Sequence, residues 1–328
     1  MQQIIYYSLF LYDEAGGSTS GQDRSAGQNA RYLSQLQASV LSIRRVNKTI
    51  PIYVFAYGDD IPPPLLRELF VLGVEFSHLG AYEEALQPYV GKLSKPLARY
   101  PTLHRWLSLR MLLELPARQI IYLDCDTLFV RDPGPFFERF SEHSLYAREE
   151  PFSRRSEWGY DPDAIDEDAF GVLARSVGVR ILSPFNIGLF AYDHRFSRVI
   201  CQRLPVLFSF VVRFIAWMHQ HPDPGADSHG LISEMRDGFS DAIASGEVII
   251  PLAYPSRNRW IVDEVALWLT LGSISDFSVG WLPREQILQG DEFATSTGEF
   301  TGCHYYSRNQ TPFLKWAGKH GFAPPRSS

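Results

Sequence analysis

Two carboxylates stand close together in an otherwise apolar stretch of the chain. Asp124 and Asp126 lie within residues 120–130, and Leu128 resumes the apolar run directly after them. Side chains two residues apart in extended chain point to one face, where two unpaired carboxylates would repel each other. A divalent cation removes that conflict and can also bridge the oxygens of a diphosphate. The pair therefore predicts a metal site that binds a diphosphate, with a plain turn after a strand as the simpler alternative.

The elements that position this pair follow from the hydrophobic periodicity of the first half. Short apolar runs predict strands, and amphipathic stretches between them predict helices. Such alternation favours an α/β fold with a mostly parallel central sheet, whose ligands bind beyond the carboxyl ends of the strands. We expect functional residues just after Leu9, Ala56 and Leu123. The strands are expected at residues 4–9, 50–56, 74–78 and 119–123, and the helices at residues 30–45, 64–72 and 102–115.

The second half of the chain is less regular. Residues 181–192 read as a strand that is interrupted near Asn186 and Gly188, since an Asn-X-Gly sequence is also a turn signal. Residues 146–170 are rich in charged side chains and are expected to form a mobile surface segment. No internal repeat or linker interrupts the sequence, so we expect one domain with insertions over residues 1–328.

Charge and cysteine content exclude several classes of protein. The net charge of −6, without a long basic run, argues against a nucleic-acid partner. Cys125, Cys201 and Cys303 are too few and too scattered for a disulfide framework or a four-cysteine zinc site. They indicate a reducing compartment, and we expect a cytoplasmic protein. The first ten residues resemble a strand rather than a signal peptide.

The longest apolar stretch covers residues 205–218 and has Arg213 near its middle. It is too short to span a bilayer, so no transmembrane segment is expected. We interpret it as a buried or partly exposed helix. Peripheral contact with a membrane surface is the alternative.

The sequence Tyr122-Leu-Asp-Cys-Asp-Thr-Leu resembles the Asp-X-Asp motif of GT-A fold glycosyltransferases, in the form found in family 8 and its relatives. The resemblance implies a Rossmann-like nucleotide-diphospho-sugar transferase fold. In that fold the two acids hold Mn²⁺ on the diphosphate of a nucleotide sugar. The resemblance extends over roughly residues 3–316, although only short segments match the family's motifs closely. It implies a nucleotide-sugar-binding half at residues 1–135 and an acceptor-binding half with insertions at residues 136–328.

Two further patches belong to the same resemblance. Phe185-Asn-Ile-Gly-Leu-Phe is similar to the family's FNxGxxxF segment, which implies that Asn186 lies near the donor sugar and that Gly188 allows close approach of the backbone. His304 matches the family's third metal ligand, and an imidazole among oxygen ligands favours Mn²⁺ over Mg²⁺. The family's HFxGxxKPW continuation does not follow His304. Arg308 is the nearest cationic substitute for the phosphate-binding lysine, and Lys315 is a weaker one.

The catalytic segment has two candidates. The family places an acid–amide pair at a helix start after the Asn-X-Gly strand, and Asp263 and Glu264 stand at an expected helix N-terminus. The helix dipole also favours acids there. The rival segment contains Asp227 and His229 and is closer in sequence to Asn186. We prefer Asp263 and Glu264, because the family's order then continues to the late histidine. Neither segment has the glutamine, which leaves the stereochemical outcome open.

Nucleotide contacts are expected at the end of the first strand and on the helix before the Asp pair. Ser8, Phe10 and Tyr12 are the candidates at the strand end, and either aromatic ring could stack on a uracil. Arg105 matches a basic position that often faces the diphosphate. Ordinary packing or a solvated charge is the alternative for all four residues.

These observations together predict a glycosyltransferase. It would move a sugar from a nucleotide-diphosphate donor, a UDP-sugar, to a hydroxyl on a glycan, lipid-linked or small-molecule acceptor. The reaction would depend on Mn²⁺ or Mg²⁺, and the resemblance implies retention of the anomeric configuration. A nucleotidyltransferase acting on a sugar phosphate is one alternative, because the Gly-rich residues 16–24 could imitate its triphosphate loop. A catalytically inactive nucleotide-sugar-binding protein is the other.

Overall fold

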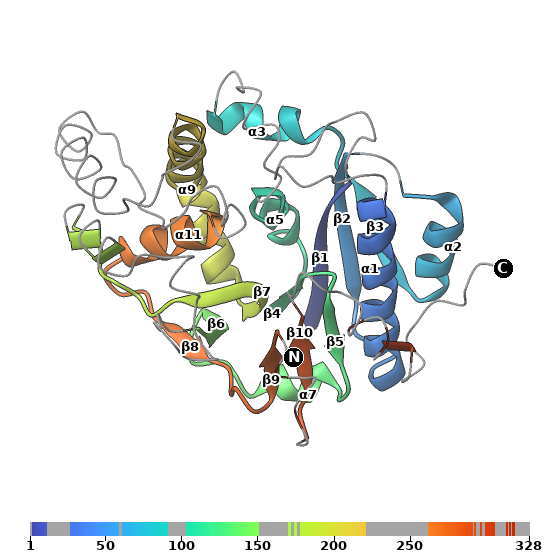
Figure 1. The fold of residues 1–328 in the computed structure, drawn as a ribbon. Coiled ribbons are helices and arrows are strands. Elements are labelled where there is room, and N and C mark those ends of the chain that lie inside the picture. Colours follow the sequence, from blue (N-terminus) through green and yellow to red (C-terminus); the bar gives the residue numbers. More distant parts are fainter. Residues whose placement is uncertain are drawn as a thin grey trace.

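The structure is a computed structural model with an α/β architecture (Figure 1). It describes residues 2–11, 27–58, 61–90, 103–150, 170–171, 174–175, 178–220, 262–290, 292, 296, 299–305, 313, 315 and 317–318.

The central sheet has seven strands in the order β3-β2-β1-β4-β7-β6-β8. The first four strands along the chain run parallel, whereas β7 is antiparallel to both of its neighbours. Strand β6 pairs in parallel with the edge strand β8. The prediction of an α/β fold with a mostly parallel central sheet is therefore confirmed. The strands are β1 Gln3–Leu11, β2 Ile52–Gly58, β3 Val74–His78, β4 Gln119–Leu123, β6 Leu145–Glu149, β7 Phe185–Tyr192 and β8 Val279–Trp281.

Helices cover both faces of this sheet, which explains why its central strands are apolar on both sides. In Figure 1, α5, α9 and α11 lie on one side of the sheet and α1 and α2 on the other. Successive residues of β4 enter different core clusters: Tyr122 belongs to the cluster that includes residues of α5, α6, α9 and α11, and Leu123 to the one that includes residues of α1 and α2. All five residues of β4 are buried as a result. The helices are α1 Gly27–Val46, α2 Pro63–Val71, α3 Tyr82–Val90, α5 His104–Leu107, α6 Leu109–Leu112, α7 Pro133–Glu138, α9 His194–Gln220 and α11 Val262–Gly272.

A second, three-stranded sheet brings distant parts of the chain to the end of β4. Its order is β5-β10-β9, with β5 Thr127–Phe129, β9 Ile287–Gln289 and β10 Gly302–His304. Strand β10 pairs antiparallel with β5 and parallel with β9. Because β5 begins one residue after Asp126, this pairing places the last residue of β10 beside the Asp pair.

Three expectations about local structure differ from the structure in detail. Strand β7 is continuous and buried, but its register against β6 shifts between the pairs of Phe190 and Phe185, and the N–H of Gly188 bonds to Oδ1 of Asn186. The interruption expected near Asn186 and Gly188 is therefore an irregularity of register and not a break in the strand. Residues 146–149 are part of the buried strand β6 and not a surface segment, whereas residues 151–169 lie outside the described part. The helical stretch at residues 102–115 is divided at Ser108 into the two short helices α5 and α6.

Helix α9 contains the whole of the long apolar stretch at residues 205–218 and has Pro205 in its interior. Within the described ranges, no helix combines the length and the apolar character needed to cross a bilayer.

Candidate metal and donor site

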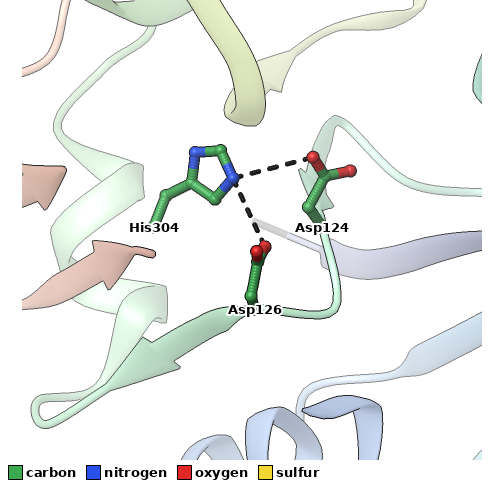
Figure 2. Close-up of side chains that lie close together, drawn as sticks. All are labelled: Asp124, Asp126 and His304. Carbon is green, nitrogen blue, oxygen red and sulfur yellow. Dashed lines mark ion pairs between the residues drawn. The ribbon is translucent and has the colours of Figure 1, made fainter. Parts of the chain in front are cut away.

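Three potential metal ligands converge at the carboxyl end of β4. The Nε2 atom of His304 lies 3.6 Å from a carboxylate oxygen of Asp124 and 3.4 Å from one of Asp126. Figure 2 shows the imidazole facing both carboxylates. One ligand atom from each residue falls within 4.8 Å of the others. Two carboxylates and one imidazole form a donor set that suits a divalent cation such as Mn²⁺.

The two acids reach this position through a turn and not through extended chain. The backbone N–H and the hydroxyl of Thr127 both donate to the carbonyl of Asp124, at 3.2 and 2.8 Å. The backbone N–H of Tyr305, directly after β10, donates to the carbonyl of Asp126 at 2.9 Å. Both acids are therefore anchored by their own backbone, although the extended geometry expected from their spacing is wrong.

Gly188 makes room for the imidazole. A Cβ atom at this position of β7 would lie 1.9 Å from Cε1 and 2.2 Å from Nε2 of His304. The carbonyl of Gly188 accepts a 2.7 Å bond from the N–H of Asp124. The close backbone approach expected at Gly188 is thus to the side chain of His304.

Tyr122 and Arg105 hold the carboxylate of Asp124 from the other side. The hydroxyl of Tyr122 donates to Oδ1 of Asp124 at 2.5 Å, and Nη1 of Arg105 lies 3.7 Å from the same oxygen. The guanidinium of Arg105 also stacks over the ring of Tyr122, 5.5 Å from its centroid. These contacts leave Oδ2 of Asp124 facing His304.

Arg105 connects the metal ligands to the start of α11. Its Nε lies 3.2 Å from Oδ2 of Asp263, which also accepts a 3.2 Å bond from the indole of Trp106. The carboxylate of Glu264 accepts bonds from the side-chain amide of Asn186 at 3.3 Å and from the N–H of Ile187 at 3.2 Å. The fold therefore brings the segment of Asp263 and Glu264 against β7, and the side chain of Arg105 connects Asp263 to Asp124.

The three candidate ligands influence one another's charge states. Burial opposes ionisation of Asp124, but the charges of Arg105 and His304 and the bond from Tyr122 hold the pKa of Asp124 below its ordinary value. Burial alone would lower the pKa of His304, yet its hydrogen bond to Asp126 and the charges of Asp126 and Asp124 raise it. Both shifts favour charge pairing between the imidazole and the two carboxylates, the interaction that a divalent cation would replace.

Two further groups near Arg105 have displaced pKa values. Burial raises the pKa of Asp263 to about 6, although Arg105 and Trp106 both stabilise its carboxylate. Burial, together with the charge of Arg105, lowers the pKa of His104 to about 3, so that this imidazole is neutral at neutral pH. The guanidinium of Arg105 therefore lies near an acid with a raised pKa and a histidine that is neutral at neutral pH.

The structure describes some of the residues predicted to contact the nucleotide, and others lie outside its described part. The hydroxyl of Ser8 is buried and bonds to Nδ1 of His104 at 2.7 Å and to the hydroxyl of Ser108 at 3.2 Å. Phe10 packs edge-to-face on Tyr82, with ring centroids 5.2 Å apart. Lys315 is exposed. Tyr12, Asp227, His229, Arg308 and the Gly-rich residues 16–24 lie outside the described residues.

Several residues of the site were missed from the sequence. Tyr122 stands two residues before Asp124, and the period of a strand could have placed both side chains on one face. His104 and Trp106 flank Arg105 but carry no motif. Glu150 is buried. Burial lowers the pKa of His304, and the charge of Glu150 helps to raise it, although less than Asp126 and Asp124 do. Glu150 lies in the segment that the sequence assigned to the surface.

Comparisons with known proteins support the fold. No protein-family model and no curated protein matches the sequence. The structure of the bifunctional glycosyltransferase WbbM matches 93% of this chain with a TM-score of 0.52 and 12% identity, and this chain covers 46% of that protein. The galactosyltransferase LgtC, in complex with donor and acceptor sugar analogues, gives a TM-score of 0.49 at 12% identity, with 96% of this chain and 95% of that chain covered. Mouse xyloside xylosyltransferase 1 gives 0.46 at 14% identity, with 94% and 98% covered. At 12% identity the likeness to WbbM, whose TM-score exceeds 0.5, shows a shared GT-A fold and no more, and this chain spans less than half of that WbbM chain.

Proposed function

We propose that this protein is a glycosyltransferase that moves a sugar from a nucleotide-diphosphate donor, a UDP-sugar, to a hydroxyl acceptor. The observation that carries the proposal is the convergence of Asp124, Asp126 and His304 at the carboxyl edge of a parallel sheet. In open α/β sheets this edge is where ligands bind.

The three side chains fit a divalent cation, and Mn²⁺ suits the mixed oxygen and nitrogen donors better than Mg²⁺. A cation held there supplies positive charge that neutralises the diphosphate as it departs from the sugar. The protein contributes the fixed geometry of the ligands through Tyr122, through Gly188 and through the backbone contacts of both acids.

Arg105 is the proposed phosphate-facing cation of the chain. Its side chain is 12% exposed and lies between Asp124 and Asp263. A preorganised guanidinium stabilises developing negative charge without reorganising during the reaction. Phe10, Ser8 and Tyr12 remain the proposed contacts of the base and ribose. In this role Ser8 acts through His104, to which its hydroxyl is bonded.

Asp263, Glu264 and Asn186 are the proposed catalytic residues. Glu264 accepts a bond from Asn186 at the start of β7, and Asp263 lies 3.2 Å from Nε of Arg105. A carboxylate at this point can stabilise positive charge that develops at the anomeric carbon or orient the incoming hydroxyl. We propose retention of configuration on the family resemblance alone.

The remaining assignments follow from the same proposal. We assign donor binding to residues 1–135 and acceptor binding to residues 136–328, with a glycan, lipid-linked or small-molecule acceptor. The three cysteines are free in the structure, in accord with a reducing compartment, and we propose a cytoplasmic location.

A turnover assay with purified protein tests this function. UDP- and GDP-sugars are supplied with Mn²⁺ and a set of sugar acceptors, so that the sugar passes to an acceptor hydroxyl or to water, and release of the nucleoside diphosphate is measured with and without EDTA. We expect release from one donor that EDTA abolishes and that Asp126→Ala lacks, whereas Glu114→Ala, an exposed acid of the described surface, keeps it. Pyrophosphate release from UTP and a sugar phosphate would support the nucleotidyltransferase instead. Nucleotide binding without any turnover would support the inactive binding protein.

A further inference from the structure

A buried ion pair connects the two sheets behind the metal ligands. Arg148, in β6 of the central sheet, is 1% exposed, and its two terminal nitrogens donate to both carboxylate oxygens of Glu292 at 2.7 and 2.5 Å. Glu292 lies three residues after the end of β9, in the part of the chain that belongs to the small sheet. The pair thus has the two-pronged geometry that fixes both distance and orientation.

Short contacts lead from this pair to His304. The carboxylate of Glu292 also accepts a 2.9 Å bond from the backbone N–H of Gln289, the last residue of β9. Gln289 stands beside His304 in the parallel register of β9 and β10. The N–H of Gly290 donates to the carbonyl of His304 at 2.9 Å. Glu292 is therefore two backbone contacts away from the proposed metal ligand.

Stability alone explains this pair poorly. Removing two charges from water is costly, and well-packed apolar side chains of similar volume are often as stabilising as a buried ion pair. What the pair supplies is a fixed position of one element against another. The element that it fixes here is the turn after β9, where the N–H of Gly290 donates to the carbonyl of His304.

We infer that Arg148 and Glu292 are positioning residues that hold His304 at the correct distance from Asp124 and Asp126. This inference rests on the proposed metal site. The contacts described above connect Arg148 and Glu292 to His304 through the β9–β10 pairing. Residues that orient metal ligands in this way contribute about 10- to 100-fold to metal affinity.

Mn²⁺ binding measured by electron paramagnetic resonance, without nucleotide, tests the inference. Arg148→Met should weaken Mn²⁺ binding by about tenfold or more. Arg148→Lys, which keeps the charge but not the two-pronged contact, should give an intermediate loss. The matched control is Arg131→Met, which removes an exposed ion pair with Glu299 from the same small sheet. It should stay within about twofold of wild type. Equal affinity of Arg148→Met and wild type would overturn the inference.

A double-mutant comparison separates positioning from general loosening of the fold. In a His304→Ala background, the affinity that His304 provides is already absent, so Arg148→Met should cause no further loss of Mn²⁺ affinity. Additive losses in the two variants would show that the ion pair does not act through His304. Should Arg148→Met fail to fold, Arg148→Lys and Glu292→Gln take its place.

A second readout keeps the inference distinct from the proposed function. If the wild-type protein binds no Mn²⁺, the metal site is wrong, and the position of the imidazole is then followed directly by NMR with ¹⁵N-labelled histidine. The His304 signal, identified with His304→Ala, should shift in Arg148→Met and not in Arg131→Met. An unchanged signal in Arg148→Met would contradict the positioning role.

Discussion

The imidazole of His304 fills the space in which a side chain at position 188 would stand. Gly188 lies in the middle of β7, and His304 ends β10, 116 residues later in the chain. A central strand is otherwise a poor place for glycine, which has no side chain to pack there. The small residue and the ring therefore form one unit, and each explains the presence of the other.

Gly188→Ala should displace the imidazole and damage the metal site. We expect Mn²⁺ affinity to fall about tenfold or more, and overpacking to cost about 1–3 kcal/mol of unfolding free energy. Denaturant titration and Mn²⁺ titration measure the two effects. His304→Ala removes the obstructing ring, so the double variant should be more stable than Gly188→Ala alone. A double variant that is no more stable would contradict the steric explanation.

Tyr122→Phe should weaken Mn²⁺ binding with little change of shape. The substitution removes the hydroxyl that donates to Asp124 and keeps the buried ring. We expect a loss of about tenfold in Mn²⁺ affinity, because hydrogen-bonded carboxylate ligands lose orientation without their partners. Tyr192→Phe is the matched control, since Tyr192 belongs to the same aromatic cluster and, in the described part of the structure, its contacts are with other aromatic rings such as Tyr6. Equal effects of the two variants would deny Tyr122 a specific role.

The raised pKa of Asp263 predicts a pH dependence of stability. In the folded protein this carboxyl has a pKa of about 6, above its ordinary value of 3.8, so between these two values the folded state binds more protons than the unfolded state. Stability should therefore fall as the pH rises through this window, by at most roughly 3 kcal/mol from this group. Urea titrations of wild type and Asp263→Asn at pH 4 and pH 7 measure the effect as a difference. If both proteins lose or gain the same free energy between these pH values, Asp263 does not have the raised pKa.

Arg105→Met should reduce turnover strongly while the protein remains folded. The guanidinium connects Asp124, Asp263 and the carbonyl of Ile187, and it is the proposed cation for the diphosphate. We expect kcat/KM for the donor to fall by about 100-fold. Arg110→Met is the control, because Arg110 is an exposed residue of the next helix that stacks on Tyr89. A loss confined to general stability, equal in both variants, would remove Arg105 from the donor site.

Much of the fold was predictable from local patterns. The apolar runs of β1 and β4 and the amphipathic pattern of α1 carry their own periodicity, and the Asp pair interrupts an apolar run at a strand end. These features require no knowledge of distant residues. The continuous course of β7 was not predictable in this way, because Asn186 and Gly188 favour a turn locally, and the strand is held by pairing of other residues with β4 and β6.

The supports of the site were hidden for a related reason. Arg148 looks like a surface charge in sequence, because its partner Glu292 is 144 residues away. The packing of the His304 imidazole against Gly188 likewise depends on contact between the two sheets. Only the resemblance to family 8 connected His304 with the Asp pair in advance.

Mn²⁺ titration of wild type, Asp124→Ala, Asp126→Ala and His304→Ala, each with and without UDP, tests the proposed site most directly. We expect saturable binding of one Mn²⁺ by the wild-type protein, tightened by UDP, and a large loss of that binding in all three variants. Equal Mn²⁺ binding by wild type and the variants would contradict a metal–diphosphate site at Asp124, Asp126 and His304. UDP binding of equal affinity with and without Mn²⁺ would contradict it as well.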